Sequence, residues 1–142
     1  MNLIQEIKMG LYAKYQTTTL WTVDAIPFYL DHVPQSVNYP VICCYHISGN
    51  FDMAMPNLAT KPEGWDYCNS RFQLSIYGND KNHVQIEDIA KRLSLAFHRT
   101  SLTLGNNCTH IATILINDRT AFWDANQKIW TVSQDYRIMA GV

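Results

Sequence analysis

The stretch YCNSRFQLSIYGNDKNHVQIEDIAKRLSLAF, residues 67–97, decides the fold of this chain. Within it Phe72, Leu74 and Ile76 alternate with polar residues, and a period of two is typical of a strand with one buried face. Gly78 and the Asn and Asp residues after it end that pattern, because these residues favour turns and cap helices. Apolar residues then recur every three or four positions along the chain, which places them on one face of a helix: Ile86, Ile89, Ala90, Leu93, Ala96 and Phe97. The stretch predicts a strand, a polar turn and an amphipathic helix, and nothing in it indicates catalysis.

The residues before this stretch predict a first helix and two or three strands. Residues 2–15 place apolar side chains on one helical face, and Asn2 with Gln5 fits a capping box. Prolines interrupt the next segment, where we expect one short strand at residues 28–31. Residues 41–47, VICCYHI, are rich in β-branched and aromatic residues, which predicts a buried strand. Residues 48–66 have no period and carry two prolines and two glycines, which predicts a long loop that orders against a partner.

The residues after position 97 predict a C-terminal β-hairpin at about residues 109–139. THIATILIN, residues 109–117, has high β-propensity, and a polar turn near residues 124–127 precedes a last alternating segment. A length of 142 residues suits a single domain, here residues 1–142. The predicted order α-β-β-β-α-β-β places the chain in the α+β class. We expect an antiparallel sheet of four to five strands with two helices packed on one face.

Charge and composition exclude several classes of function. The net charge is −1 and both signs are scattered, so no basic block indicates nucleic-acid binding. No apolar run approaches the roughly 18 residues that cross a bilayer, and the first residues do not resemble a secretory signal. The cysteines form no CxxC pair, and we interpret them as buried thiols in a reducing compartment: Cys43, Cys44, Cys68 and Cys108.

No motif in the chain indicates catalysis, a metal or a cofactor. The five histidines have neither HxH nor HExxH spacing, and no GxSxG, Walker or GxGxxG sequence occurs. A cluster of His46 and His110 on neighbouring strands remains open at this point, as do Cys–His pairs drawn from several cysteines. We therefore predict no catalytic residue, no metal ligand and no cofactor.

Aromatic and Met residues outside the predicted core indicate a surface for a partner. Aromatic residues fill small cores, but they are also enriched at protein interfaces. Those that lie in predicted loops or at hairpin ends are the candidate interface residues: Trp21, Phe51, Met53, Met55, Trp65, Phe122 and Trp123.

Several segments together resemble one family. They are the opening helix, the extended segment VDAIPFYLDHVPQSVNYPVI in which Tyr39-Pro40 leads into a buried strand, the strand FQLSIYG, the helix IEDIAKRLSLAF and the closing hairpin that ends in YRIM. This organisation resembles the tail terminator and tail-completion proteins of long-tailed bacteriophages, which cap the tail tube and join it to the head. The likeness covers nearly the whole chain. The loop at residues 48–66 and the hairpin DRTAFWDANQKIW look longer than in the family's minimal form.

The resemblance implies a structural virion protein without enzymatic activity. It would form a homo-oligomeric ring, usually of six copies, at the head–tail junction of a virion assembled in the host cytoplasm. Its partners would be further copies of itself, the tail tube protein and a head-completion or connector protein, with neither a sequence-specific nucleic acid nor a membrane.

One alternative interpretation belongs to another class of function. A small α+β ligand-binding or enzyme domain would enclose an apolar pocket against the sheet. Its pocket would be lined by Tyr45, His46, Tyr77, Trp130 and Tyr136.

Overall fold

The computed structural model describes residues 3–54, 65–105 and 108–141, with the backbone alone at residues 50–54 and 65–67. Along this part, the chain forms α1 (Leu3–Tyr15), α2 (Thr19–Thr22), β1 (Phe28–Leu30), β2 (Val41–Ala54), β3 (Trp65–Gly78), α3 (His83–Phe97), β4 (Thr109–Asp118), β5 (Phe122–Asp124) and β6 (Ile129–Gly141). The α+β class is therefore confirmed. The short helix α2 was not expected from the sequence.

The described strands form one six-stranded sheet. Their order is β1-β2-β3-β6-β4, and β5 pairs with the first residues of β6. The neighbouring strands are antiparallel, except that β1 runs parallel to β2. The sequence predicted an antiparallel sheet of four to five strands, whereas the described sheet has six strands and its β1–β2 pair is parallel. Residues 31–40 lead the chain back to the end of the sheet where β1 begins, so that β1 and β2 point the same way.

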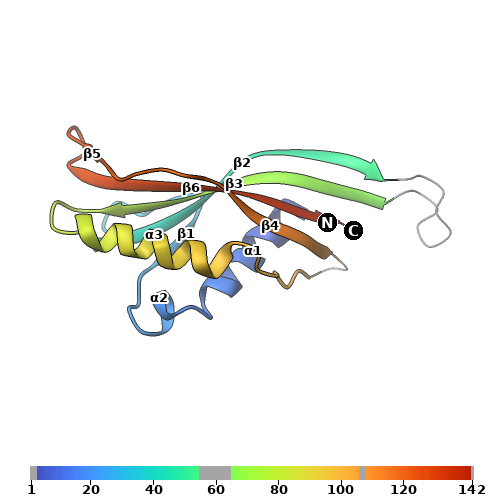
Figure 1. The fold of residues 1–142 in the computed structure, drawn as a ribbon, viewed down its shortest axis with the longest axis horizontal. Helices are drawn as coiled ribbons and strands as arrows, with labels where there is room; N and C mark the ends of the chain where they lie inside the picture. Colours follow the sequence, from blue (N-terminus) through green and yellow to red (C-terminus); the bar gives the residue numbers. More distant parts are fainter. Residues whose placement is uncertain (1–2, 55–64, 106–107, 142) are drawn as a thin grey trace.

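The central hairpin is longer than the sequence indicates. The β2–β3 register runs without a break in pairing from Val41↔Tyr77 to Ala54↔Trp65, with one bulge between His46 and Ser48. The predicted loop at residues 48–66 is therefore wrong at both of its ends, and only its residues 55–64 lie outside the described residues. Pairing with β3 holds the polar end of β2 in a strand. Figure 1 shows this hairpin extending beyond the helices.

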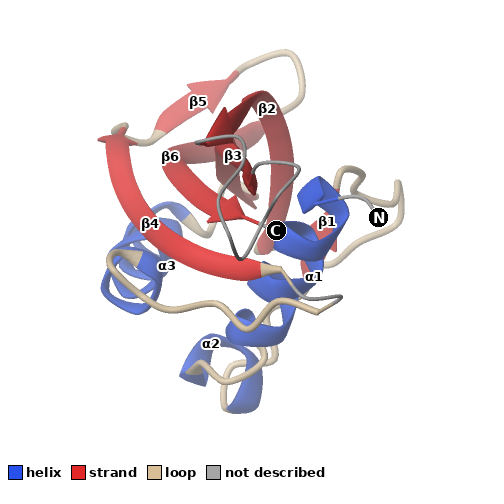
Figure 2. Ribbon diagram, turned by 90° about the vertical axis from the view of Figure 1, so that its right-hand side faces the viewer, coloured by secondary structure: helices blue, strands red, loops and turns tan. Residues whose placement is uncertain are grey.

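The two long helices lie on one side of the sheet, as predicted (Figure 1). The end-on view in Figure 2 shows the helices gathered beside strongly twisted strands. Their apolar faces meet alternate residues of β2, β3 and β6 in one core. Two glycines allow close packing within it. A Cβ on Gly10 of α1 would lie 2.8 Å from Leu104 Cδ2, and one on Gly78 would lie 2.7 Å from Ile86 Cγ2.

Candidate partner surfaces

The two faces of the sheet differ in chemistry. Phe72, Leu74 and Ile76 of β3 point toward the helices and are buried. Strand alternation places Arg71 and Ser75 on the opposite face. Polar side chains lie on that face, and several of them are buried and hydrogen-bonded. For example, Ser75 and Ser133 are buried, and their hydroxyl oxygens lie 3.4 Å apart. The sheet therefore has an apolar side closed by helices and a polar side that no helix covers in the described part of the chain.

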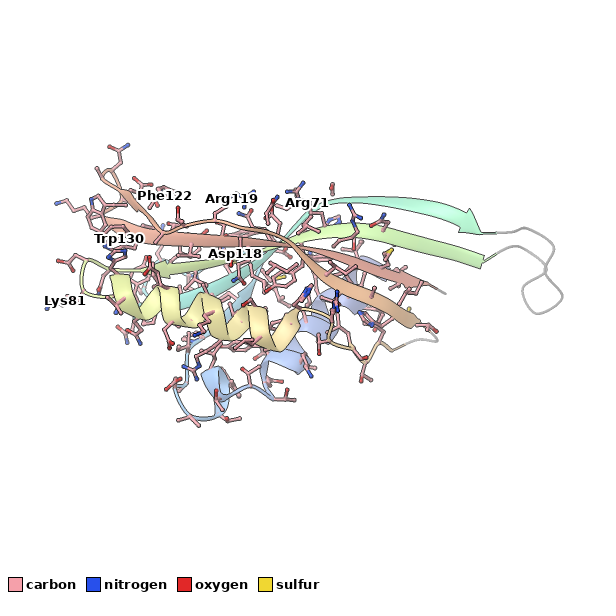
Figure 3. All side chains as sticks on the ribbon, viewed as in Figure 1. Arg71, Lys81, Asp118, Arg119, Phe122 and Trp130 are labelled. Atoms are coloured by element: carbon pink, nitrogen blue, oxygen red, sulfur yellow. The ribbon has the colours of Figure 1, made fainter. Side chains whose placement is uncertain are left out.

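Asp135 of β6 is the centre of the polar face. Its side chain is only 3% exposed. Arg119 donates two hydrogen bonds to it, Nη1 to Oδ1 at 3.1 Å and Nη2 to Oδ2 at 2.8 Å. Arg71 Nη2 donates to Oδ2 at 2.5 Å, and Asn117 Nδ2 lies 3.3 Å from the same oxygen. Figure 3 shows Arg71 and Arg119 on the side of the sheet away from α3.

This arrangement keeps the Asp135 carboxylate ionised. Burial alone raises the pKa of a carboxyl group, because it disfavours the charged form. Hydrogen bonds from Arg119, Arg71 and Asn117 outweigh that effect and lower the pKa of Asp135 to about 2. Two guanidinium groups on one carboxylate leave a net positive charge. The polar face is therefore cationic around this point.

A cluster of aromatic rings lies at the end of the sheet where β5 meets β6. The His83 ring stacks on Trp130, with 4.0 Å between ring centroids and 8° between planes, and Trp123 lies 5.5 Å from Trp130. Phe122 is 57% exposed and Trp123 is 39% exposed. Figure 3 shows Phe122 and Trp130 at the same end of the molecule as Lys81. This end therefore carries exposed apolar surface.

The predicted interface residues do not all lie together. Phe122 and Trp123 are neighbours in β5, whereas Trp21 belongs to α2 and packs 6.3 Å from the Tyr15 ring. The side chains of Phe51, Met53 and Trp65 lie outside the described residues, and so does all of Met55. Their part in an interface stays a prediction.

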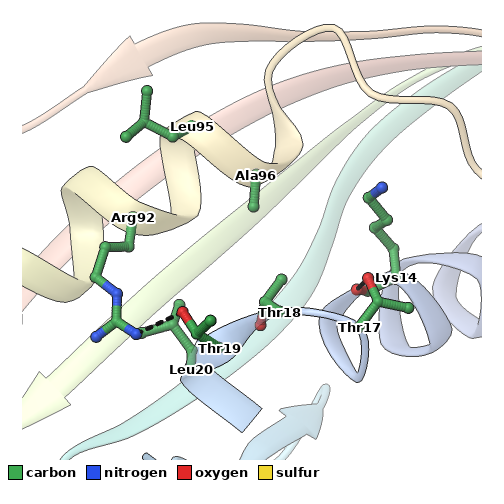
Figure 4. A pocket seen from close by; sticks show the side chains of 8 residues that line it. All are labelled: Lys14, Thr17, Thr18, Thr19, Leu20, Arg92, Leu95 and Ala96. Carbon is green, nitrogen blue, oxygen red and sulfur yellow. Dashed lines mark hydrogen bonds between the residues drawn. The ribbon is translucent and has the colours of Figure 1, made fainter. Parts of the chain in front are cut away.

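An open hollow of about 500 Å³ separates the end of α1 from α3 (Figure 4). Most of its polar groups are already engaged. Arg92 Nη1 lies 2.6 Å from Asp24 Oδ2, and Arg92 Nη2 donates to Thr19 Oγ1 at 2.7 Å. Thr17 and Thr18 donate their hydroxyl hydrogens to main-chain carbonyls of α1. We interpret this hollow as the boundary between α2 and α3, which the contacts of Arg92 hold together.

The structure does not bring His46 and His110 onto neighbouring strands. His46 is in β2 and His110 in β4, and both β3 and β6 separate these strands. His46 packs against Phe72 with 5.1 Å between ring centroids, while His110 Nε2 lies 2.7 Å from Thr113 Oγ1. Burial lowers the pKa of His110. No group of three His, Cys, Asp or Glu side chains in the described ranges could hold a metal ion.

The four cysteines are buried and unbridged, as expected from the sequence. Burial raises the pKa of each thiol, with further contributions from neighbouring groups. A raised pKa keeps a thiol protonated at neutral pH, and the thiolate is the reactive form. The described geometry therefore gives these cysteines a packing role: Cys43, Cys44, Cys68 and Cys108.

The five residues of the alternative ligand pocket lie on opposite faces of the sheet, so they do not line a single pocket, although Tyr45 and Tyr77 line an open hollow together. Tyr45 and Tyr77 are on the polar face, where their hydroxyl oxygens are 3.1 Å apart. His46 and Tyr136 lie one residue out of phase with them and point toward the helices, and Trp130 packs against the same core. The period of two in a strand is the reason, because neighbouring residues cannot line one cavity.

Within the described residues, the helices are too short or too polar to cross a membrane.

Comparisons with known proteins support the fold. No family model and no curated protein matches this chain. Thirteen chains of solved structures match it. One of them belongs to the virion of a native gene transfer agent (GTA) particle, with a TM-score of 0.75 and 11% sequence identity. The match covers 99% of this chain and 98% of that chain, so the two share a fold from end to end.

Proposed function

We propose that this chain is a structural virion protein that acts by assembly and not by catalysis. The end-to-end fold shared with a chain of the GTA virion carries this proposal. The described residues include three surfaces suited to contacts between subunits: a projecting hairpin, exposed aromatic rings and a cationic sheet face.

We further propose that the protein forms a ring, of six copies in the family that the sequence resembles, at the head–tail junction. The ring would cap the tail tube and contact a head-completion or connector protein on its other side. A ring requires heterologous interfaces, in which two different patches of one subunit meet on neighbouring copies. Each such interface should bury on the order of 1,000 Å² or more.

The outer edge of β2 is one candidate for such a patch. The short strand β1 covers it only from Ile42 to Cys44, and Asp31 N–H donates to Cys44 O beside it. Beyond that point, β2 pairs with β3 on one side and has no second strand in the described part of the chain. An unpaired edge presents free N–H and C=O groups to another strand.

The opposite edge of the sheet is partly closed. Arg99 N–H donates to Thr113 O of β4, and Leu115 N–H donates to His98 Nδ1. Two bulges, between His110 and Ala112 and between Leu115 and Asn117, also disturb this strand. Bulges and covering segments are the usual protection of an edge. The long hairpin is therefore the better candidate for contact through a strand.

Measurement of mass in solution, together with negative-stain imaging, tests this proposal. A six-fold ring that binds the ends of isolated tail tubes and stops their further growth would support it. A protein that stays monomeric at high concentration and binds no tube end would contradict the ring and the capping role. Density for this chain at another place in purified particles would contradict the head–tail position alone.

A further inference from the structure

A small polar hollow lies beside the Asp135 cluster, on the face of the sheet away from the helices. Its volume is about 170 Å³, enough for several water molecules at about 30 Å³ each. It lies next to the bulge of β2 between His46 and Ser48, and bulges often re-aim side chains at functional sites. The lining residues come from four strands: Ser48, Asn69, Ser70, Arg71, Ile116 and Arg137.

Two arginines that line this hollow are neighbours on adjacent strands. Arg71 of β3 and Arg137 of β6 are direct cross-strand partners in the register. Like charges in that relation destabilise a sheet. Asp135 compensates Arg71 but also takes two hydrogen bonds from Arg119. Arg137 is exposed and makes neither a hydrogen bond nor an ion pair within the described residues. Two guanidinium groups therefore share the Asp135 carboxylate, and the third, that of Arg137, has no anion of its own among the described residues.

One buried donor of Arg71, a residue that lines the hollow, has no acceptor in the described structure. Arg71 Nε is buried and makes no hydrogen bond in the described structure, although Nη2 of the same side chain binds Asp135. A buried donor without an acceptor destabilises the folded chain, because it has lost its hydrogen bonds to water. Its acceptor has to come from outside the chain, either as water or as a group of a partner. Arginine is suited to this role because its planar fork binds a carboxylate through two parallel hydrogen bonds.

Three isoleucines belong to the strand segments that form the hollow or adjoin it. Ile116 lines the hollow, Ile114 is the cross-strand neighbour of Arg137 and is 36% exposed, and Ile47 at the bulge is 50% exposed. Exposed apolar residues around arginine are typical of the energetic centre of a protein interface, where neighbours exclude water from the central contact.

We propose that this hollow binds the side-chain carboxylate of an aspartate or glutamate on a partner protein. The carboxylate accepts hydrogen bonds from the exposed Arg137 guanidinium, and the positive charge of the neighbouring Arg71 also attracts it. A protein carboxylate fits better than the phosphates of DNA, because the site is a single hollow in a chain of net charge −1. Nucleic-acid affinity depends on many phosphate contacts along a basic surface.

A titration followed by nitrogen-15 NMR of the arginine Nε–H groups tests the site. The probe is N-acetylglutamate N-methylamide, and its glutamine counterpart, which lacks the carboxylate, is the control ligand. We expect a saturable shift of the Arg71 Nε–H signal with the glutamate derivative alone. Arg137→Gln should weaken that binding about tenfold or more, as expected for the loss of a charged hydrogen bond. Lys91→Gln removes an exposed cation from α3, on the other side of the sheet, and should leave binding unchanged.

Charge reversal provides the second measurement. It is needed because the probe would cause no shift if a carboxylate of a neighbouring copy already occupied the hollow. In that case Arg137→Glu should lower the mass of the assembly in solution, while Lys91→Glu should not. The proposal is overturned if the titration and the mass are both unchanged, or if the glutamine derivative acts like the glutamate derivative. It is also overturned if a short DNA duplex binds the hollow more tightly than the glutamate derivative. A monomeric wild-type protein that binds the probe would contradict the ring and leave this site in place.

Discussion

Replacement of Asp135 with asparagine should destabilise the protein and remove part of its acid sensitivity. The variant keeps the shape of the side chain but leaves Arg71 and Arg119 without their shared anion. The two arginine side chains are 38% and 50% exposed, so water partly replaces the carboxylate, and the loss of hydrogen bonds to a charged group should cost about 1.5–3 kcal/mol. We expect a loss of that size in the free energy of unfolding at neutral pH. Asp31→Asn is the matched control, because it breaks an exposed pair with Lys8 and should cost at most about 1 kcal/mol.

The pH dependence of stability gives a second, independent magnitude for Asp135. Its pKa falls from 3.8 to about 2 in the folded state, which corresponds to about 2.4 kcal/mol at 1.36 kcal/mol per pKa unit. A carboxyl group whose folded pKa is depressed binds fewer protons in the folded state than in the unfolded state. Its stabilising contribution is complete above the unfolded pKa, and it disappears as the pH falls from about 5 toward 2.

Urea unfolding followed by tryptophan fluorescence measures both effects. Wild type should lose about 2 kcal/mol more than Asp135→Asn between pH 5 and pH 2, because half of the folded molecules still carry an ionised Asp135 at pH 2. Other carboxylates contribute equally to both proteins. An identical pH dependence in the two proteins would refute the depressed pKa. If Asp135→Asn does not fold, Arg119→Gln removes a half-exposed partner instead. It should reduce the acid-dependent loss without abolishing folding.

Three further substitutions have expected outcomes. Gly78→Ala places a Cβ 2.7 Å from Ile86 Cγ2, so overpacking should cost about 1–3 kcal/mol in urea unfolding, and unchanged stability would contradict that tight contact. Tyr136→Phe removes the hydroxyl that donates to Gln134 Oε1 at 2.9 Å, and the buried acceptor left behind should lower stability by about 1–3 kcal/mol in thermal unfolding. Phe122→Ser should change stability by less than about 0.5 kcal/mol but weaken assembly, and unchanged mass of the assembly would exclude this end of the sheet as an interface.

The sequence predicted best those elements that carry a buried apolar period. The alternating residues of β3 and the three-and-four spacing of α3 correspond to real buried faces, for example Leu74 and Leu93. The far end of β2 has no such period. Ser48 and Gly49 are exposed there, and pairing with β3 makes the strand. Apolar periodicity in a sequence reflects burial of one face. A strand that is held only by hydrogen bonds to its neighbour has no such period, so its sequence predicts a loop.

The charged cluster could not be predicted in the same way. The alternation of side chains along β6 places Asp135 on the face away from the core. The sequence alone therefore predicts an exposed residue at this position. Its two arginines lie 64 and 16 positions away in the chain. The long separation to Arg71 becomes a contact only because β3 and β6 are neighbours in the sheet. Strand order, and not local pattern, assembles this part of the molecule.

We expect the helix face of the sheet to determine the stability of the subunit, and the polar face to determine its association with a partner. On the helix face, apolar side chains of α1 and α3 satisfy the strands within one chain, so substitutions there should act on unfolding alone. On the other face, one buried carboxylate organises two of three arginines and leaves Arg137 and Arg71 Nε without acceptors among the described residues. A protein that worked as a monomer would gain by removing that charge, because Arg137→Thr relieves the repulsion and keeps a residue favoured in strands. We therefore expect Arg137→Thr to raise the unfolding midpoint of the isolated subunit while it weakens contact with an acidic partner. A fall in the midpoint would mean that Arg137 stabilises its own chain, and the case for an external carboxylate would fail.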